Sequence, residues 1–166
     1  MISDRRYAYL LLLCVFLPGC YSLKGYSISA EVKTFYVGQF KLTALNAPAT
    51  LNQTFAEALK DKISRESRLK YADESSDLEF NGTIQSFNVN AVAPQPGERT
   101  AFNRLTISMS VEYTNRLDSK DHWTKTFSYF ADFPAEQNLL QVQDELIEII
   151  FDQILEDIFN QAFNNW

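Results

Sequence analysis

Apolar and polar residues alternate most regularly over residues 105–113. Every second side chain there is large and apolar, and Thr, Ser or Glu lies between, the apolar set being Leu105, Ile107, Met109, Val111 and Tyr113. Successive side chains of a β-strand point to opposite faces of a sheet, so this segment is predicted to be a strand with one buried face. Its second face is rich in Thr and Ser and is expected to stay open, where it can receive a partner.

A second half-buried strand is predicted over residues 78–85. Its apolar positions are again two apart, and they change phase beyond Ser86, which predicts a β-bulge near that residue. The dipeptide Asn81-Gly82 also fits the two-residue turn of a β-hairpin. Because the alternation keeps its phase through the dipeptide, one continuous strand is favoured, and Gly82 is expected to mark the close approach of a helix.

Two more strands complete the predicted sheet. Residues 32–40 are rich in β-branched and aromatic types, which favour extended structure. Residues 123–133 are aromatic on both faces and are expected to pair with 105–113 as a hairpin, across a polar turn over 115–121. A turn containing Pro and Gly over residues 94–100 precedes that hairpin.

Apolar spacings of three and four residues predict two amphipathic helices. The first covers residues 50–69 and has a charged outer face. The second covers about 139–164 and has a broad apolar stripe made of Leu139, Val142, Leu146, Ile149, Ile150, Ile154, Leu155, Ile158, Phe159, Ala162 and Phe163. Helices that lie on a membrane favour Lys and Arg on their polar face. The polar face of this helix is acidic, so packing on the protein core is favoured over membrane binding.

The predicted order of elements is β-α-β-β-β-α. Each helix has one apolar face, and that face needs a sheet to cover it. The simplest arrangement is an α+β, two-layer sandwich: a four-stranded, mostly antiparallel sheet with two helices on one face. The chain has 166 residues, which suits one such domain.

The N-terminal segment has the pattern of a secretion signal. Arg5 and Arg6 precede an apolar run over residues 7–17, which ends in Leu17-Pro18-Gly19-Cys20. A membrane-spanning helix needs about 20 apolar residues, more than this run has. An ordinary secretory signal needs an Ala-x-Ala-like cleavage site near the end of the run, and none is there. A bacterial lipoprotein signal is therefore favoured, although Pro18 takes a place that a small residue usually holds.

A lipoprotein signal assigns a covalent modification to Cys20. Its sulfur is expected to carry diacylglycerol through a thioether, and its amine is acylated after cleavage. Residues 1–19 are then the signal peptide, 20–30 a lipidated tether and 31–166 one folded domain. Several acyl chains anchor a protein firmly, whereas a single chain binds only marginally. No further cofactor is expected.

Composition and charge exclude several classes of function. The net charge is −6, so the chain lacks the basic footprint that nucleic acid requires. Cys14 falls in the signal and Cys20 is acylated, which leaves no thiol for a disulfide or a metal site. His122 is the single histidine and lies at a predicted turn, so no Ser-His-Asp or Cys-His centre is expected. The protein is therefore predicted not to be an enzyme.

The connection after the first helix contains one further group that is able to touch a cation. Asp73, Glu74 and Asp77 lie close together in the sequence. Their spacing is not that of an EF-hand loop. No metal site is therefore predicted.

Several segments, taken in order, resemble one family. They are Cys20-Tyr21-Ser22-Leu23, the helical segment 51–62, the strand segments 77–84 and 103–107, Phe130-Ala131-Asp132-Phe133, residues 156–160 and the ending Asn165-Trp166. Their order and spacing over the whole mature chain make the resemblance specific. The chain resembles the lipopolysaccharide-assembly lipoproteins of the LptE family.

This resemblance implies a two-layer α+β sandwich, anchored by its acyl chains on the periplasmic face of the outer membrane. Proteins of this kind partner the large β-barrel LptD, partly plug its lumen, and help it to fold and to insert lipopolysaccharide into the outer leaflet. Some bind lipopolysaccharide directly through basic residues. The candidates in this chain lie beside predicted turns: Arg99, Arg104, Arg116, Lys120 and Lys125. A solvated surface role is the alternative for each.

Two other functions are considered for a tethered domain. A periplasmic lipid carrier needs an apolar cavity between the sheet and the helices. A regulatory lipoprotein that reaches a cell-wall enzyme needs a long disordered tether. About ten residues separate Cys20 from the first predicted strand, which is a short tether.

Overall fold

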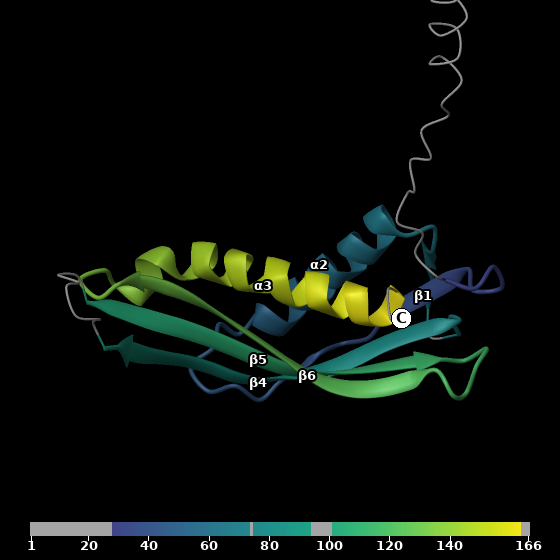
Figure 1. The fold of residues 1–166 in the computed structure, drawn as a ribbon, viewed down its shortest axis with the longest axis horizontal. Coiled ribbons are helices and arrows are strands. Elements are labelled where there is room, and N and C mark those ends of the chain that lie inside the picture. The colour runs from purple at the N-terminus through teal and green to yellow at the C-terminus, as the bar shows by residue number, and fades with distance from the viewer. Residues whose placement is uncertain (1–27, 74, 94–100, 164–166) are drawn as a thin grey trace, which may run out of the picture.

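The computed structural model describes residues 28–73, 75–93 and 101–163, which form one long twisted sheet with two helices on one side (Figure 1). In chain order the elements are β1 (Thr34–Val37), β2 (Lys41–Leu42), α2 (Leu51–Glu66), β3 (Lys70–Tyr71), β4 (Leu78–Val92), β5 (Phe102–Asn115), β6 (His122–Pro134) and α3 (Leu139–Phe163). The predicted α+β class and its two helices are confirmed. Within the described ranges, neither helix has the length and apolar character needed to cross a bilayer.

The three longest strands form an antiparallel meander at the centre of the fold. β5 pairs with β4 on one side and with β6 on the other, so Tyr113 lies between Phe80 and Trp123. The rings of Tyr113 and Trp123 stack with their centroids 5.3 Å apart. The hairpin predicted from residues 105–113 and 123–133 is confirmed.

The prediction of a four-stranded sheet is wrong, because the described residues form a sheet of six strands. Most of the pairing is antiparallel, as predicted, and lies between the long strands β4, β5 and β6. β1, β2 and β3 are short and run parallel to their neighbours: β1 pairs with β3 and β4, and β2 pairs with β4 further along. The predicted strand 32–40 is too long, since β1 ends at Val37, residues 38–40 belong to no strand and β2 begins beyond them at Lys41. β3 has two residues, too few for an alternating pattern to reveal it.

Phe40 covers a position of β4 that has no side chain. A Cβ atom on Gly82 would lie 2.5 Å from the Ser110 carbonyl oxygen and would overlap the Phe40 ring. That ring is buried and packs edge-on against Phe55 of α2, with the centroids 5.0 Å apart. Asn52 of α2 donates from Nδ2 to the Phe40 carbonyl oxygen at 2.8 Å and holds the segment in place. The group that approaches Gly82 is therefore the Phe40 ring, and the prediction of a helix there is wrong.

β4 bends at the predicted bulge. Ile84 pairs with Met109 and Ser86 pairs with Ser108, so Gln85 is the extra residue. This extra residue moves Phe87 onto the face covered by the helices, where it is buried. The phase change in the sequence thus has the predicted cause.

The two helices share the apolar face of the sheet. α3 packs on β5 and β6, whereas α2 packs on the short strands β1, β2 and β3. The helices cross (Figure 1), and Phe55 of α2 meets Phe151 of α3 edge-on with ring centroids 5.0 Å apart.

Both helices differ in detail from the prediction. α2 is shorter than the predicted 50–69, because the Ser67 hydroxyl donates a hydrogen bond to the Ile63 carbonyl oxygen at 2.6 Å and ends the helix. Ile149, expected in the core stripe of α3, is 47 % exposed on its outer side.

One buried cation joins the two helices. Lys62 Nζ lies 2.9 Å from Glu66 Oε1 on the same helix and 2.7 Å from Glu156 Oε2 on α3. Burial alone lowers the pKa of Lys62, but hydrogen bonds and charge interactions with the two glutamates outweigh burial and raise it. The amine therefore stays charged at neutral pH and ties α2 to α3.

We expect Gly82→Ala to destabilise the domain by about 2 kcal/mol, because the new methyl group overlaps the Phe40 ring and the Ser110 carbonyl. Urea unfolding of the full chain, followed by circular dichroism, measures the loss as a lower midpoint at an unchanged slope. Thr124→Ala, at an exposed position of β6, is the control and should change stability by less than about 0.5 kcal/mol. Equal midpoints for the two variants would contradict the packing at Gly82.

Candidate functional site

The basic residues predicted to contact lipopolysaccharide lie at two separate ends of the sheet. Arg104 is near the start of β5 and Arg116 directly follows its end, so roughly 40 Å of strand separates them. Lys120 is exposed in the β5–β6 turn near Arg116, and Lys125 follows on β6. Arg99 lies outside the described residues. The described members therefore do not form one basic cluster.

Arg104 lies on the surface at the end of the sheet away from Arg116. At this end the backbone N–H of Ala135 donates to the carbonyl oxygen of Ala101. Its Nε and Nη2 donate to the two carboxylate oxygens of Asp132 at 2.7 and 2.8 Å. The guanidinium carbon lies 3.6 Å from the centroid of the Phe130 ring. Hydrogen bonds from Arg104 lower the pKa of Asp132. The charge of Arg104 already has a bidentate partner, which fits a structural role better than capture of a phosphate.

Two of the remaining candidates also have partners. Arg116 Nη2 lies 2.7 Å from Glu79 Oε2 of β4, and this hydrogen bond is the main cause of the lowered pKa of Glu79. Lys125 Nζ donates to Gln161 Oε1 of α3 at 2.7 Å. Within the described part of the chain, the Lys120 side chain makes no such bond. Lys120 is therefore the described candidate that remains available to an anion.

The end of the sheet that lies opposite Arg104 is here called the anchor end, and the described chain begins there. It comprises residues 28–32, the start of β4, the β5–β6 turn and the C-terminal end of α3. Arg68, just beyond α2, donates from Nη2 to the carbonyl oxygens of Ile28 and Ser29 at 2.8 and 2.6 Å. These bonds fix the point at which the predicted tether meets the domain. Arg68 is not predictable from the sequence, because an exposed arginine that binds backbone carbonyl oxygens leaves no pattern there.

Asp77 fastens the same end. Its Oδ2 accepts hydrogen bonds from the backbone N–H groups of Lys33 and Thr34 at 2.8 and 2.9 Å, and from Thr34 Oγ1 at 2.9 Å. These bonds, that of the Lys33 N–H above all, lower the pKa of Asp77. Its carboxylate is thus used to align β1 with β4. Because the Asp77 carboxylate is occupied by these hydrogen bonds, it is poorly placed to bind a cation together with Asp73. Glu74 lies outside the described residues.

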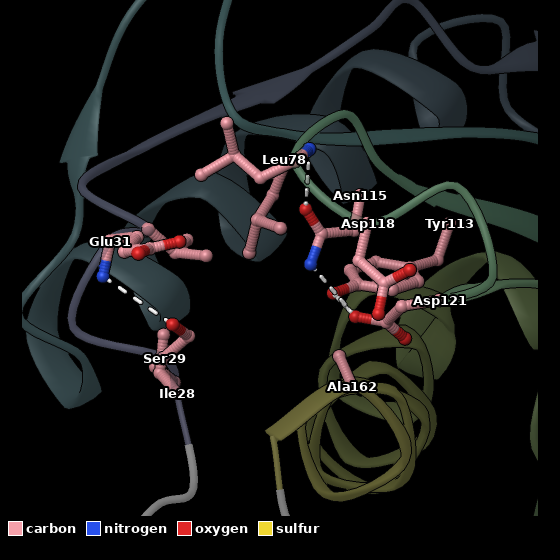
Figure 2. Close-up of a pocket in the computed structure, with 11 residues that line it drawn as sticks. Ile28, Ser29, Glu31, Leu78, Tyr113, Asn115, Asp118, Asp121 and Ala162 are labelled. Atoms are coloured by element: carbon pink, nitrogen blue, oxygen red, sulfur yellow. Dashed lines mark hydrogen bonds between the residues drawn. The ribbon is translucent and has the colours of Figure 1, made fainter.

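A pocket of about 430 Å³ opens at the anchor end, between residues 28–32 and the β5–β6 turn (Figure 2). Asp121 Oδ2 accepts hydrogen bonds from Tyr113 Oη at 3.0 Å and from Asn115 Nδ2 at 2.9 Å. Burial, together with the charge of Asp121, raises the pKa of Tyr113, so the phenol remains a donor. The carboxylates that line this pocket belong to Glu31, Asp118 and Asp121. The pocket is therefore polar and acidic.

The chemistry around His122 is that of a surface turn. Its ring is exposed at the start of β6, and Nδ1 lies 3.0 Å from the Ser119 carbonyl oxygen. In the residues that the structure describes, no three His, Cys, Asp or Glu side chains are grouped so as to hold a metal ion.

The sheet face turned away from the helices, here called the open face, carries short polar side chains. The register aligns Ser86 with Ser108 and Ser108 with Ser128, and the first two hydroxyl oxygens lie 2.6 Å apart. The neighbouring row is also made of hydroxyl side chains, namely Thr83, Ser110 and Thr126. Phe130 is 43 % exposed beneath Arg104 and gives this face its aromatic character. The Thr- and Ser-rich face predicted for residues 105–113 is present.

Comparison with known proteins decides the family. The family model described as Lipopolysaccharide-assembly, LptE, matches residues 32–162. The chain belongs to the LptE family. The match covers almost all of the described residues and confirms the resemblance found in the sequence. No curated protein matches the chain.

Solved structures with the same fold include three bacterial proteins at low sequence identity. A minor lipoprotein from Acinetobacter baumannii is 12 % identical, with 77 % of this chain and 91 % of that chain covered and a TM-score of 0.50. A hypothetical protein from Chlamydia trachomatis is 8 % identical, with 81 % and 99 % covered and a TM-score of 0.55. A protein from Xanthomonas campestris is 8 % identical, with 78 % and 83 % covered and a TM-score of 0.54. These likenesses show that the fold of this chain also occurs in solved bacterial proteins of very different sequence.

We expect Asp77→Asn to lower the free energy of unfolding at pH 7 by about 1 kcal/mol, since it replaces a charged acceptor of three hydrogen bonds. The pKa of Asp77 is lowered in the folded state, so its contribution is present above the unfolded pKa of about 3.9 and is lost as the pH falls through the lower folded value. The difference in free energy of unfolding between the variant and the wild type, measured by urea unfolding, should therefore become smaller from pH 7 towards pH 2.

Asp73→Asn is the control for that measurement. Asp73 is an exposed carboxylate in the same connection, and its replacement should be within about 0.5 kcal/mol of neutral. The interpretation would be contradicted if the loss of unfolding free energy in Asp77→Asn stayed constant with pH or equalled that of the Asp73 variant. The charged Asp77 carboxylate would then not stabilise the anchor end.

Proposed function

We propose that this LptE protein is a non-catalytic subunit of the lipopolysaccharide translocon, in which it partly plugs an LptD-like β-barrel and assists its assembly. The observation that carries the proposal is the family match over residues 32–162. Assembly of lipopolysaccharide at the outer membrane is the role that this family implies.

The geometry of the anchor end supports a position close to the membrane. Seven residues lie between Cys20 and Ile28, and the eight Cα-to-Cα steps from one to the other span at most about 28 Å when extended. Arg68 holds the carbonyl oxygens of Ile28 and Ser29, so the tether leaves the domain at a fixed point. A lipid on Cys20 would therefore keep the anchor end near the periplasmic face of the outer membrane.

The open face supports contact with a barrel wall. The interiors of outer-membrane barrels are polar, and the rows of Ser and Thr on this face present short hydroxyl groups at regular spacing. Short polar side chains lose little rotamer freedom when they are buried, and their hydroxyl groups can bond to either donors or acceptors. Such a face suits a wet, hydrogen-bonded interface.

Direct contact with lipopolysaccharide remains part of the proposal for the basic candidates Arg99, Arg104, Arg116, Lys120 and Lys125. Arg104 and Arg116 are already paired with carboxylates, so Lys120, near the membrane-proximal end, is the first described residue to test. The competing role of a lipid carrier has less support. Its apolar cavity would lie between sheet and helices, where buried side chains such as Phe55 and Leu59 fill the space.

We expect Cys20→Ser to leave an unlipidated or uncleaved precursor, because the serine oxygen cannot form the thioether. Metabolic labelling with a fatty acid and the apparent mass of the protein measure this. Cys14→Ser, in the signal, is the matched control and should be processed normally. Unchanged acylation of the Cys20 variant would remove the basis for the anchor.

Depletion of the protein should leave an LptD-like barrel misfolded or degraded, because the barrel would lose the domain that supports its lumen. Immunoblots of heat-modifiable barrel and surface lipopolysaccharide measure the effect. Wild-type protein supplied from a plasmid is the control and should restore both. Normal barrel and normal surface lipopolysaccharide after depletion would overturn the proposed function.

A further inference from the structure

The outer side of the helical layer contains a groove between α2 and α3, here called the acidic groove. Its volume is about 400 Å³. The floor is apolar and is made of Leu51, Ile147, Phe151 and Leu155. The two helices cross beside it (Figure 1), and each of the four floor side chains is largely buried, with 2–7 % of its surface exposed. The groove is therefore a depression between the two helices with the edge of the apolar core at its bottom.

One wall of the acidic groove is a row of carboxylates. Asp144, Glu148 and Asp152 lie four residues apart on α3, and all three are exposed and line the groove. A helix rises about 6 Å over four residues, so the three charges form a line along the floor. Like charges at this spacing repel one another and destabilise a helix.

These carboxylates have no compensating cation among the residues that the structure describes. Asp144, Glu148 and Asp152 make no ion pair there, whereas Glu156, one turn further on, is paired with Lys62. α3 itself contains no Lys or Arg over residues 139–163. The row of charge therefore stands unneutralised beside apolar surface.

The opposite wall is small and uncharged. It is formed by Pro48, Thr50, Thr54 and Ala58 from α2 and the residues before it. A ligand in the groove would meet carboxylates on one side only, and short side chains that leave room on the other. The site thus selects a ligand with one apolar face and positive charge along one edge.

We propose that the acidic groove binds an amphipathic segment of a partner protein, with apolar side chains on the groove floor and Lys or Arg side chains against the row of Asp144, Glu148 and Asp152. Charge complementarity identifies the partner class. A polyanionic lipid would be repelled by the row, whereas a basic segment relieves the repulsion within it. This proposal does not depend on insertion into a barrel.

The test uses the full-length lipoprotein in intact cells, with a photo-crosslinking amino acid at one of two positions. Thr54 lies on the uncharged wall of the groove, and Thr126 is an exposed position on the open face. From Thr54 we expect a crosslink to another protein, and mass spectrometry should place it in a segment that carries Lys or Arg next to apolar residues. A crosslink to lipid, to an acidic segment or to the protein's own chain, or none, would overturn the proposal.

Charge variants make the test quantitative. Asp144→Asn, Glu148→Gln and Asp152→Asn together should lower the Thr54 crosslink yield at least fivefold and leave the Thr126 pattern unchanged. The matched control neutralises three exposed acidic residues outside the groove lining, Glu57→Gln, Glu145→Gln and Asp157→Asn, and should change the yield less than twofold. Equal yields from the two triple variants would overturn the role of the carboxylate row.

A steric variant guards against a folding artefact. Ala58→Tyr fills the groove from its uncharged wall without changing charge, and it should also lower the Thr54 yield severalfold. Circular dichroism and the urea midpoint of each variant report whether the fold is kept. A folded Ala58→Tyr protein with the wild-type crosslink yield would place the partner outside the groove and contradict the proposal.

Discussion

The whole structure depends on covering one long apolar face of the β4–β5–β6 meander. Leu105, Ile107 and Met109 of β5 are fully buried on that face, and each such side chain contributes roughly 1.5–3 kcal/mol when it leaves water. α3 is long enough to cover most of it. α2 covers the short strands β1, β2 and β3 beside it. Its position is fixed where the Phe40 ring fills the space left by Gly82 and meets Phe55. Because the helices occupy one face, the hydroxyl-rich face stays open.

The sequence predicts the parts of this fold that rest on long, regular patterns. The strand 105–113, the bulge beyond Ile84 and the helix from Leu139 each repeat a spacing over many residues, and all three are present. β2 and β3 are two residues long, so their existence depends on pairing with β4 and β1, which no local pattern encodes. Ile149 matches the spacing of the core stripe, yet it lies on the outer side of α3 because of the way this helix packs on the sheet and against α2.

The site is less predictable than the fold, because it depends on which residues the register brings together. Arg104 and Arg116 look equivalent in the sequence, but the length of β5 places them at opposite ends and Asp132 and Glu79 pair with them there. Arg68 acts on backbone carbonyls and is invisible to pattern analysis. The resulting molecule has an anchor end held by Arg68 and Asp77, an open hydroxyl face and an acidic helical face. A domain of this kind presents surfaces to partners and fits a role in lipopolysaccharide assembly.

The most direct test of this role is to purify the tagged, full-length lipoprotein from outer membranes. Mass spectrometry then identifies the proteins that remain bound to it. We predict that one large outer-membrane β-barrel co-purifies in near-equal amount and that the complex survives washing at high salt. Recovery of the lipoprotein without any β-barrel, from membranes that contain the lipopolysaccharide translocon, would contradict it.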